Sequence, residues 1–184
     1  MNHIGTVKIE TGRLLLRKFI YEDIPDMIEN WIANPAVQNE YGEPIYETPD
    51  AVQELLSKWI IQYNNNDFYR WAIILKENNE NIGQIAFCRV YTEMETAEIE
   101  YCIGENFWGK GYALEALNAV IDFAIKEPQF YKLEAFHRIA NLRSGRVLEK
   151  TVMKKVENIR RFEIKNIIPE KDVCYAVVRD DYPI

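Results

Sequence analysis

Apolar residues follow two different spacings along this chain, one typical of helices and the other of strands. They recur every three or four positions in residues 23–34, 49–63 and 111–127, which predicts three amphipathic helices. Pro128 follows the third segment directly and disfavours helical backbone in the residue before it, so we expect the helix to end there. A shorter segment, residues 141–150, also reads as a helix.

Short apolar runs bounded by polar turn residues predict the strands. Three of them follow one another closely in the middle of the chain, which predicts an antiparallel meander. The expected order is β–α–α–β–β–β–α–β–α–β–β, a mixed α+β sheet protein, and 184 residues suit a single domain over residues 1–184. The expected strands are residues 13–19, 68–75, 81–91, 96–104, 130–139, 153–166 and 172–180.

Charge and apolar content limit the kinds of partner that this chain can bind. The formal net charge is −7, and an acidic surface repels phosphate backbones, so we expect no nucleic acid partner. No run approaches the roughly 18 apolar residues of a membrane-spanning helix, so we expect no membrane partner. The first residues contain no apolar run of the signal-peptide type, which favours a cytoplasmic location.

Cysteine and histidine are sparse and widely spaced. Cys88, Cys102 and Cys174 are odd in number and lie in strand-like apolar runs, which favours reduced, buried thiols over disulfides. His3 and His137 have no second ligand candidate nearby in the sequence. The sequence therefore predicts no metal site.

A pair of glycines marks the point where a predicted strand gives way to a predicted helix. The strand ends near Ile103 and the helix begins near Gly111, two residues after Gly109. The first amides of a helix have no intrahelical partner and attract anions, and glycine allows positive φ and a close backbone approach. These residues predict a phosphate-binding turn; the alternative is a tight strand-to-helix turn with no ligand.

Two common phosphate-binding motifs fail at this turn. Gly104, Gly109 and Lys110 satisfy the first part of a P-loop, but Gly111 stands where a serine or threonine must hold Mg²⁺. The dinucleotide fingerprint fails because Leu114 occupies the place of its third glycine. The turn therefore predicts neither a nucleoside triphosphatase nor a dinucleotide site.

The stretch NFWGKGYALEAL, residues 106–117, resembles the acetyl-CoA pyrophosphate loop of the GNAT superfamily of N-acetyltransferases. NLRSGRVLEK, residues 141–150, resembles the N-x-x-S-x-R-V-L-E-K motif of its ribosomal-protein (RimJ/RimL-like) branch. TGRLLLRKF and DVCYAVVRDDY resemble the terminal strands of that branch, so the similarity covers residues 10–182.

This resemblance implies an α+β fold of the GNAT type, with a mixed, mostly antiparallel central sheet, a splayed strand pair and flanking helices. It also implies an acetyltransferase that uses acetyl-CoA as co-substrate and acts on a primary amine by direct attack in a ternary complex. The first-choice acceptor is a protein or peptide N-terminal amine. The alternatives are a small-molecule amine, such as a polyamine or an aminoglycoside, and a non-catalytic acyl-CoA-binding module. A homodimer is compatible with the family.

Three positions depart from the family pattern. Asn106 stands where glutamine or arginine is usual, and Glu100 stands where the branch often has glycine. Val152 replaces a turn glycine, so we expect a distorted entry into the strand that follows.

The resemblance also implies the catalytic groups. Glu98, in its A-E-I context, is the expected general base, acting through a water molecule. Strand alternation places it on one face with Glu100 and Cys102, so either glutamate could serve, or both could simply be acidic residues on an exposed face. Ser144 matches the branch's serine near the coenzyme sulfur and is the expected proton donor to the leaving thiolate, with a tolerated small residue inside a helix as the alternative. Many members have a tyrosine one turn later, where this chain has Leu148.

The remaining expected contacts are those of the coenzyme. Backbone groups at Tyr101, Cys102 and Ile103 and the side chain of Asn141 are expected along the pantetheine arm, with helix capping as the alternative for Asn141. Glu115 is expected to be structural. The pyrophosphate is expected at the amides of Trp108, Gly109, Lys110, Gly111, Tyr112 and Ala113, with added charge from Lys110.

The expected acceptor site lies in the loop 31–43, between the two N-terminal helices. Its acidic and aromatic side chains could receive a cationic amine. The residues expected to bind the acceptor are Trp31, Glu40, Tyr41 and Glu100, with Glu43 beside them and core packing as the alternative for Trp31.

Overall fold

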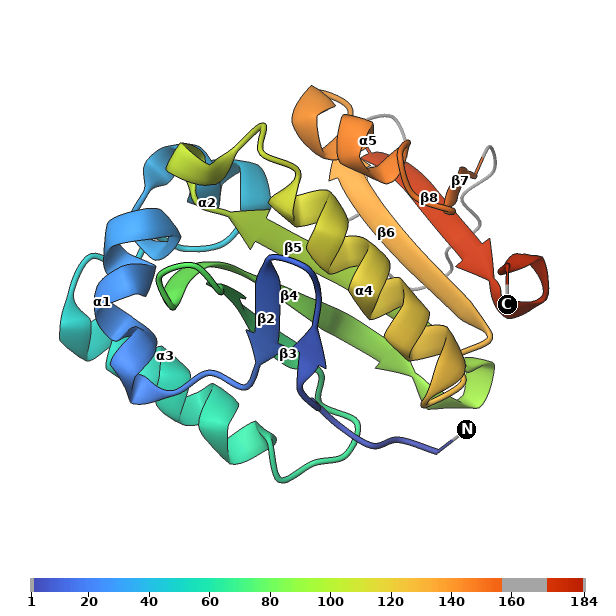
Figure 1. The fold of residues 1–184 in the computed structure, drawn as a ribbon, viewed down its shortest axis with the longest axis horizontal. Coiled ribbons are helices and arrows are strands. Elements are labelled where there is room, and N and C mark those ends of the chain that lie inside the picture. Colours follow the sequence, from blue (N-terminus) through green and yellow to red (C-terminus); the bar gives the residue numbers. More distant parts are fainter. Residues whose placement is uncertain (1, 157–171, 184) are drawn as a thin grey trace.

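The computed structural model describes residues 2–156 and 172–183. They form an eight-stranded sheet in the order β1-β2-β3-β4-β5-β6-β8-β7. Every neighbouring pair is antiparallel except β5 and β6, which run parallel because α4 connects them across one face of the sheet (Figure 1). The strands are β1 Ile9–Glu10, β2 Leu14–Arg17, β3 Arg70–Leu75, β4 Glu80–Tyr91, β5 Thr96–Ile103, β6 Lys132–Arg138, β7 Lys154–Lys155 and β8 Asp172–Val178.

The helices agree with the predicted segments, with one addition near the N-terminus. The segment expected at 23–34 divides into α1 and a π-helical stretch. The expected strand at 153–166 contains β7, and its residues from 157 onward lie outside the described residues. The helices are α1 Ile24–Met27, the π segment Ile28–Ile32, α2 Pro35–Tyr41, α3 Pro49–Gln62, α4 Tyr112–Lys126 and α5 Leu142–Leu148. Single 3₁₀ turns cover Tyr21–Asp23, Thr92–Met94, Glu105–Phe107 and Arg179–Asp181.

Helix α2 lies where a loop was expected. Asn34 caps it, because its Oδ1 accepts a hydrogen bond of 2.8 Å from the amide of Ala36, and Pro35 occupies the first position. Gly42, with φ of 85°, ends the helix in the left-handed region. These start and stop signals are all present in the sequence, so the interpretation of 31–43 as a loop was wrong.

Alternate residues of each central strand pack into two separate cores, one on each face of the sheet. On β3, Trp71 and Ile73 pack with the α4 side chains, whereas Ala72 and Ile74 pack with the N-terminal helices. Burying an isoleucine side chain such as Ile73 or Ile74 stabilises the fold by about 1.5–3 kcal/mol. The two-sided burial explains why β3 reads as a continuous apolar run.

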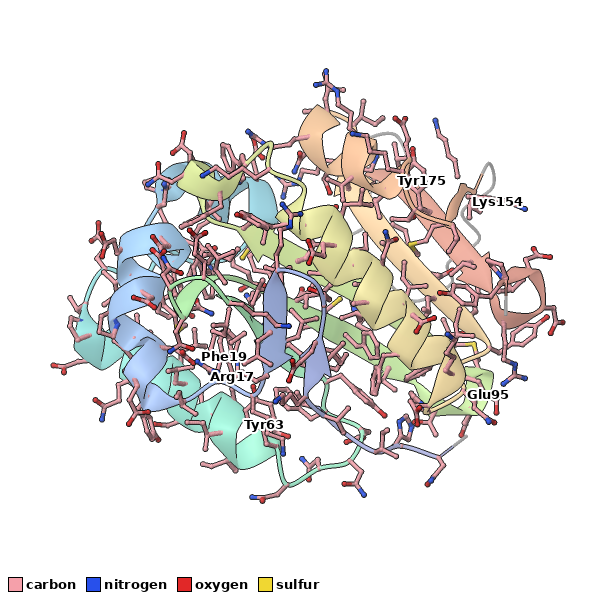
Figure 2. The ribbon with its side chains drawn as sticks, in the orientation of Figure 1. Arg17, Phe19, Tyr63, Glu95, Lys154 and Tyr175 are labelled. Carbon is pink, nitrogen blue, oxygen red and sulfur yellow. The ribbon has the colours of Figure 1, made fainter. Side chains whose placement is uncertain are left out.

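Hydrogen bonds join the N-terminal helical layer to the sheet near β3. The Tyr63 hydroxyl accepts from the amide of Phe19 at 3.0 Å and donates to the carbonyl of Arg70 at 2.9 Å. Arg17 forms an ion pair with the buried Asp23 at 2.7 Å. Figure 2 shows where Arg17, Phe19 and Tyr63 lie. The Tyr63 hydrogen bonds fix the backbone of Arg70, whose side chain lines the cavity beside β5.

Strands β5 and β6 form the splayed pair. Their parallel pairing is limited to residues 96–99 and 132–135 and ends where Ile99 faces Ala135. β5 continues to Ile103 and β6 to Arg138, and Figure 1 shows the two strands diverging. The expectation of a mixed, mostly antiparallel sheet with a splayed pair is confirmed.

The turn after α5 does not need the glycine that Val152 replaces. Among the described non-glycine residues, positive φ occurs only at Asn79, Glu95 and Gln129. Thr151 closes the turn instead, since its hydroxyl donates to the carbonyl of Leu148 at 2.7 Å and accepts from the amide of Met153 at 3.1 Å. The expected distortion is therefore wrong.

A carboxylate at the start of α4 joins this helix to the β1–β2 turn. Glu115 Oε1 accepts from Thr11 Oγ1 at 2.6 Å and from the amide of Arg13 at 2.8 Å. Its Oε2 pairs with Arg13 Nε at 2.7 Å. Burial alone would raise the pKa of Glu115, but these hydrogen bonds together outweigh it and lower the pKa below its ordinary value. The structural role expected for Glu115 is confirmed, with partners outside its own helix.

Gly83 should not tolerate a side chain. A Cβ at this position would lie 2.2 Å from the carbonyl oxygen of Cys102 and 3.0 Å from Cα of Ile103, both backbone atoms of the neighbouring strand. We expect Gly83→Ala to lower the free energy of unfolding by about 1–3 kcal/mol, measured by denaturant titration. Gly12→Ala is the control, because its Cβ would meet only Glu115 Oε1 at 3.9 Å. Equal stabilities would contradict the close approach of β4 and β5.

Replacing Glu115 by glutamine should lower stability by about 1 kcal/mol at neutral pH, because hydrogen bonds to a charged acceptor are lost. The folded-state pKa of Glu115 lies below its ordinary value of 4.5, so its contribution is present above that pH. The difference from the wild type should therefore shrink as the pH falls below 4.5. Denaturant titrations across this range measure it. Glu54→Gln, which removes an exposed pair with Lys58, should change little at any pH.

Candidate active site

A cavity of about 750 Å³ opens where β5 and β6 diverge. Its walls come from β5, the turn before α4, the end of β6, α5 and α2. These segments are distant in sequence, and the splay leaves room between them. Of the predicted site residues, all except Trp31 and Lys110 line this cavity.

The turn between β5 and α4 has the backbone expected of an anion-binding site. Residues 109–113 form this site, which we call the glycine cradle. Gly109 and Gly111 both adopt left-handed conformations, with φ of 76° and 82°, and Gly111 is the residue before α4. Among the described residues, the structure gives no protein acceptor for the amides of residues 109–114. These donors lie at the positive end of a 15-residue helix.

Arg13 of the β1–β2 turn contacts two residues of the cradle. Its Nη1 donates to the carbonyl of Lys110 at 2.9 Å, and its guanidinium lies 4.5 Å from the centre of the Tyr112 ring. Because Arg13 is also paired with Glu115, the cradle, the start of α4 and the β1–β2 turn form one connected unit. Sequence reasoning did not identify Arg13.

Trp108 and Lys110 lie differently from the prediction. The Trp108 amide donates to the carbonyl of Glu105 at 3.1 Å, so it is not a free donor, although the indole lines the cavity. Its indole Nε1 donates to the carbonyl of Ile103 at 2.7 Å. Lys110 is exposed, and its ammonium lies 5.4 Å from the centre of the Phe107 ring. The side chain of Lys110 therefore does not contribute to the cavity wall.

The two glutamates of β5 share a face, as predicted, and both carry arginine partners. Glu98 is 7% exposed and pairs with Arg89 at 2.8 Å, directly across the β4–β5 ladder. Glu100 pairs with Arg70 at 2.9 Å. This face is covered rather than open to solvent, so the alternative of an exposed acidic face is wrong for Glu98.

The pair between Arg70 and Glu100 spans three strands. Ala86 of β4 faces Arg70 on one side and Glu100 on the other, and its small side chain lets the two long ones meet above it. The Arg70 guanidinium also stacks on Trp59 and donates to Gln84. Sequence reasoning missed Arg70 because its partner lies two strands away.

The acceptor end of the cavity is acidic. Tyr41 of α2 accepts from Gln84 Nε2 at 3.1 Å, and its pKa is raised by burial and by the nearby charge of Glu100. Glu43 has a raised pKa because partial burial and the charge of Glu100 disfavour its ionised form, with Arg70 acting in the opposite sense. Glu40, Glu43 and Tyr41 line this end of the cavity, as predicted.

Trp31 does not belong to the acceptor site. It is fully buried in the core beneath the N-terminal helices, and its Nε1 donates to Asn81 Oδ1 at 2.7 Å. The helical spacing of residues 23–34 already indicated a core position, whereas the acceptor prediction grouped Trp31 with the loop that follows. The prediction for Trp31 was wrong.

One arginine links the two ends of the cavity. Arg143 of α5 pairs with Glu40 of α2 at 2.8 Å, and its guanidinium lies 3.4 Å from the centre of the Trp108 ring. Glu40 is therefore engaged by α5. Arg143 was missed because nothing in the sequence brings residues 40 and 143 together.

The first turn of α5 carries Asn141 and Ser144. Asn141 Oδ1 accepts from the amide of Ser144 at 3.0 Å, which confirms its alternative role as the helix cap. The Ser144 hydroxyl faces the cavity and lies 3.0 Å from the Tyr101 hydroxyl. Leu148 is fully buried, so its position cannot supply a polar group to the cavity.

The three cysteines are free thiols, as predicted. Cys102 is buried and Cys88 lines the cavity. Burial raises the pKa of both thiols far above the ordinary value, and the charge of Glu100 acts in the same sense. Neither is a ready nucleophile, because the thiolate is the reactive form.

The described residues, 2–156 and 172–183, include neither a metal-binding cluster nor a membrane-spanning helix. No group of three or more histidine, cysteine, aspartate or glutamate side chains there has the arrangement of a metal site. No helix in those ranges has the length and apolarity that crossing a membrane requires.

Known proteins resemble this chain in both sequence and fold. A protein named as the uncharacterized N-acetyltransferase YnaD of Bacillus subtilis is 29% identical, covering 95% of this chain and 98% of its own. The crystal structure of a GNAT-family acetyltransferase from Bacillus anthracis is 26% identical, covers 95% of this chain and 99% of its own, and superposes with a TM-score of 0.77.

Two solved structures resemble this chain in fold alone. The ribosomal-protein-S5-alanine acetyltransferase of Vibrio fischeri has a TM-score of 0.76 at 17% identity and covers 97% of this chain and 100% of its own. The microcin C7 self-immunity acetyltransferase MccE, solved with acetyl-CoA and AMP, has a TM-score of 0.74 at 17% identity and covers 91% and 93%.

A family model matches most of the chain. The pattern for the acetyltransferase (GNAT) domain covers residues 13–154, which include the cradle, the splayed strands and α5. The resemblance seen in the glycine turn and in residues 141–150 is thereby confirmed. This chain belongs to the GNAT family of acetyltransferases.

Proposed function

We propose that this enzyme uses acetyl-CoA to acetylate a primary amine, with a protein or peptide N-terminal amine as first choice. The observation that carries the proposal is the single cavity that joins the glycine cradle to the open edge of β5. A long ligand with an anionic middle and an extended arm suits this shape. The coenzyme bound by MccE has that form.

The pyrophosphate is assigned to the cradle. The amides of Gly109, Lys110, Gly111, Tyr112 and Ala113 point from a helix N-terminus without protein acceptors among the described residues. These residues are exposed or half-buried, so their amides are accessible to a ligand, and the positive end of the helix favours a diphosphate there.

The pantetheine arm is assigned to the edge of β5 that β6 leaves open. Beyond Ile99 this edge faces the cavity, so backbone groups of Tyr101, Cys102 and Ile103 can pair with the amides of the arm as a missing strand would. Asn141 lies on the opposite wall and can add a side-chain contact beside its capping bond. The thioester then reaches the part of the cavity nearest Glu98, Glu100 and Ser144.

The chemistry is direct transfer within a ternary complex. The raised pKa values of Cys88 and Cys102 keep both cavity thiols protonated, which argues against an acetyl-cysteine intermediate. The amine must attack in its neutral form. An α-amine titrates near 8 and a lysine amine near 10.4, so deprotonation costs less for a peptide N-terminus.

Glu98 is the proposed general base, acting through water. It lies in the last paired part of β5, just before the strands diverge, and Arg89 fixes its carboxylate. Glu100 lies after the divergence, nearer to Tyr41 and Glu43, and is proposed to hold the incoming ammonium group. Ser144 is the proposed hydrogen-bond donor to the leaving thiolate.

The acceptor is proposed to be cationic. Glu43 and Glu100 bring negative charge to the acceptor end, and the raised pKa of Glu43 reflects their mutual repulsion as well as burial. A bound ammonium group would relieve this repulsion. The V. fischeri fold neighbour is named for an alanine of a ribosomal protein, which favours the peptide choice. A small polyamine or aminoglycoside is the alternative that the same charge favours.

Acetyl-CoA should bind the purified protein and raise its Tm. We expect Gly109→Ala to weaken binding by about 5-fold to 30-fold, because a non-glycine residue at φ of 76° costs about 1–2 kcal/mol and moves the cradle amides. Isothermal titration calorimetry measures this. Gly5→Ala is the control, since Gly5 has φ of 68° outside the cavity lining. A wild-type protein that binds no acetyl-CoA contradicts the proposal.

Removing the proposed base should slow turnover without preventing coenzyme binding. We expect Glu98→Gln to lower kcat by about 10²–10⁴-fold, because the amine loses its proton acceptor. Glu100→Gln should mainly raise the KM of the amine. The measurement follows release of the coenzyme A thiol with a panel of peptides and small amines.

The same panel tests both assignments. A larger loss of kcat in Glu100→Gln than in Glu98→Gln would move the base to Glu100. Turnover of small amines with none of the peptides would reject the peptide acceptor. Tight coenzyme binding with no turnover of any amine would favour a non-catalytic module.

A further inference from the structure

Two hydroxyl groups from different elements meet inside the cavity. The Tyr101 hydroxyl, on β5, lies 3.0 Å from Ser144 Oγ and 3.4 Å from the Ser144 carbonyl oxygen, on α5. Both residues line the cavity on the walls that the splay separates. This contact crosses the gap between β5 and α5 beside the end of the paired region.

The direction of this hydrogen bond decides what Ser144 can do. Each hydroxyl has one proton to donate. If Tyr101 donates to the Ser144 carbonyl oxygen, Ser144 can donate to the Tyr101 hydroxyl, and no proton of this pair then faces the ligand. If Tyr101 donates to Ser144 Oγ, the Ser144 proton is free to point into the cavity, and its oxygen is held in place.

We propose that Tyr101 is a positioning residue for the leaving group: its hydroxyl donates to Ser144 Oγ and so directs the Ser144 proton to the coenzyme sulfur. This inference rests on the proposed acetyl-CoA function. It gives the side chain of Tyr101 a role separate from the backbone contacts assigned to that residue.

The distances favour this direction, because Ser144 Oγ lies 3.0 Å from the phenol oxygen and the competing Ser144 carbonyl oxygen lies 3.4 Å away. Burial raises the pKa of Tyr101 to about 12, with the Ser144 hydrogen bond acting in the opposite sense, so the phenol stays protonated near neutral pH. A protonated phenol keeps its proton available for a hydrogen bond, but with that pKa it is a poor proton source for a thiolate, whose acid titrates near 8.5. Leu148 offers no polar group, so Ser144 is the hydroxyl on α5 within reach.

The reaction balances without a proton from Tyr101. The neutral amine nitrogen forms a bond to the thioester carbon, the carbon–sulfur bond breaks, and its electron pair remains on sulfur. The nitrogen loses a proton to Glu98 through water, and sulfur finally gains one proton from solvent or from that relay. Ser144 stabilises the thiolate with a charge-assisted hydrogen bond while this happens.

The test is the pKa of the coenzyme A thiol when bound, read from the ultraviolet absorbance of the thiolate during a pH titration. A hydrogen bond to the thiolate lowers this pKa below that of free coenzyme A. We expect Ser144→Ala and Tyr101→Phe each to raise the bound pKa by about 1 relative to wild type, and the double variant to raise it no further. Tyr175→Phe is the control, because the Tyr175 hydroxyl donates to Glu149 and neither residue lines the cavity. Figure 2 shows Tyr175 on β8.

Turnover provides a second readout. We expect Tyr101→Phe to lower kcat by about 10-fold with little change in the KM for acetyl-CoA. A fluorinated tyrosine placed at position 101 keeps the packing and donates more strongly, so it should lower the bound thiol pKa below the wild-type value. This variant covers the case in which Tyr101→Phe folds poorly.

The outcomes separate the inference from the proposed function. If wild type binds no coenzyme A, both are wrong. If coenzyme A binds with wild-type affinity and the thiol pKa is the same in wild type, Tyr101→Phe and the fluorinated variant, the role of Tyr101 is overturned while the proposed function stands. A rise with Ser144→Ala alone would also overturn it.

Discussion

The parallel hydrogen bonding between β5 and β6 ends where Ile99 faces Ala135, and the geometry of the site depends on that end point. Had the pairing continued to Ile103 and Arg138, the sheet would have been closed and its edge groups satisfied. Instead, one strand leads to the glycine cradle and the other leads to α5. The gap between them supplies both a set of backbone groups and the space for a ligand.

Charge inside this gap is balanced by arginines that come from other strands. Arg89 and Arg70 form ion pairs with Glu98 and Glu100, which lie on one face of β5. Arg70 and Glu100 are both largely shielded from solvent, whereas Arg89 is exposed, so the Arg70 pair is the one that holds its carboxylate most firmly. This chain therefore carries two oriented carboxylates on β5, each with an arginine partner.

The sequence was sufficient for features that depend on local geometry. Gly109 and Gly111 announced a left-handed turn before a helix, and the alternation of β5 placed Glu98 with Glu100. Arg89 could also have been found, because it faces Glu98 across a hairpin. Contacts across three strands could not: Arg70 meets Glu100 only because Ala86 between them is small. Trp31 was misplaced because a helical apolar residue reads alike in a core and in a site.

The Arg143 side chain contacts two walls of the cavity, the turn before α4 and helix α2. Its guanidinium touches Trp108 beside the cradle and Glu40 on α2 at once. Any occupant of one wall that draws this cation away also uncovers a carboxylate on the other. Thermodynamic linkage makes such an effect mutual, so the affinities of the two substrates are coupled through one side chain wherever either displaces it.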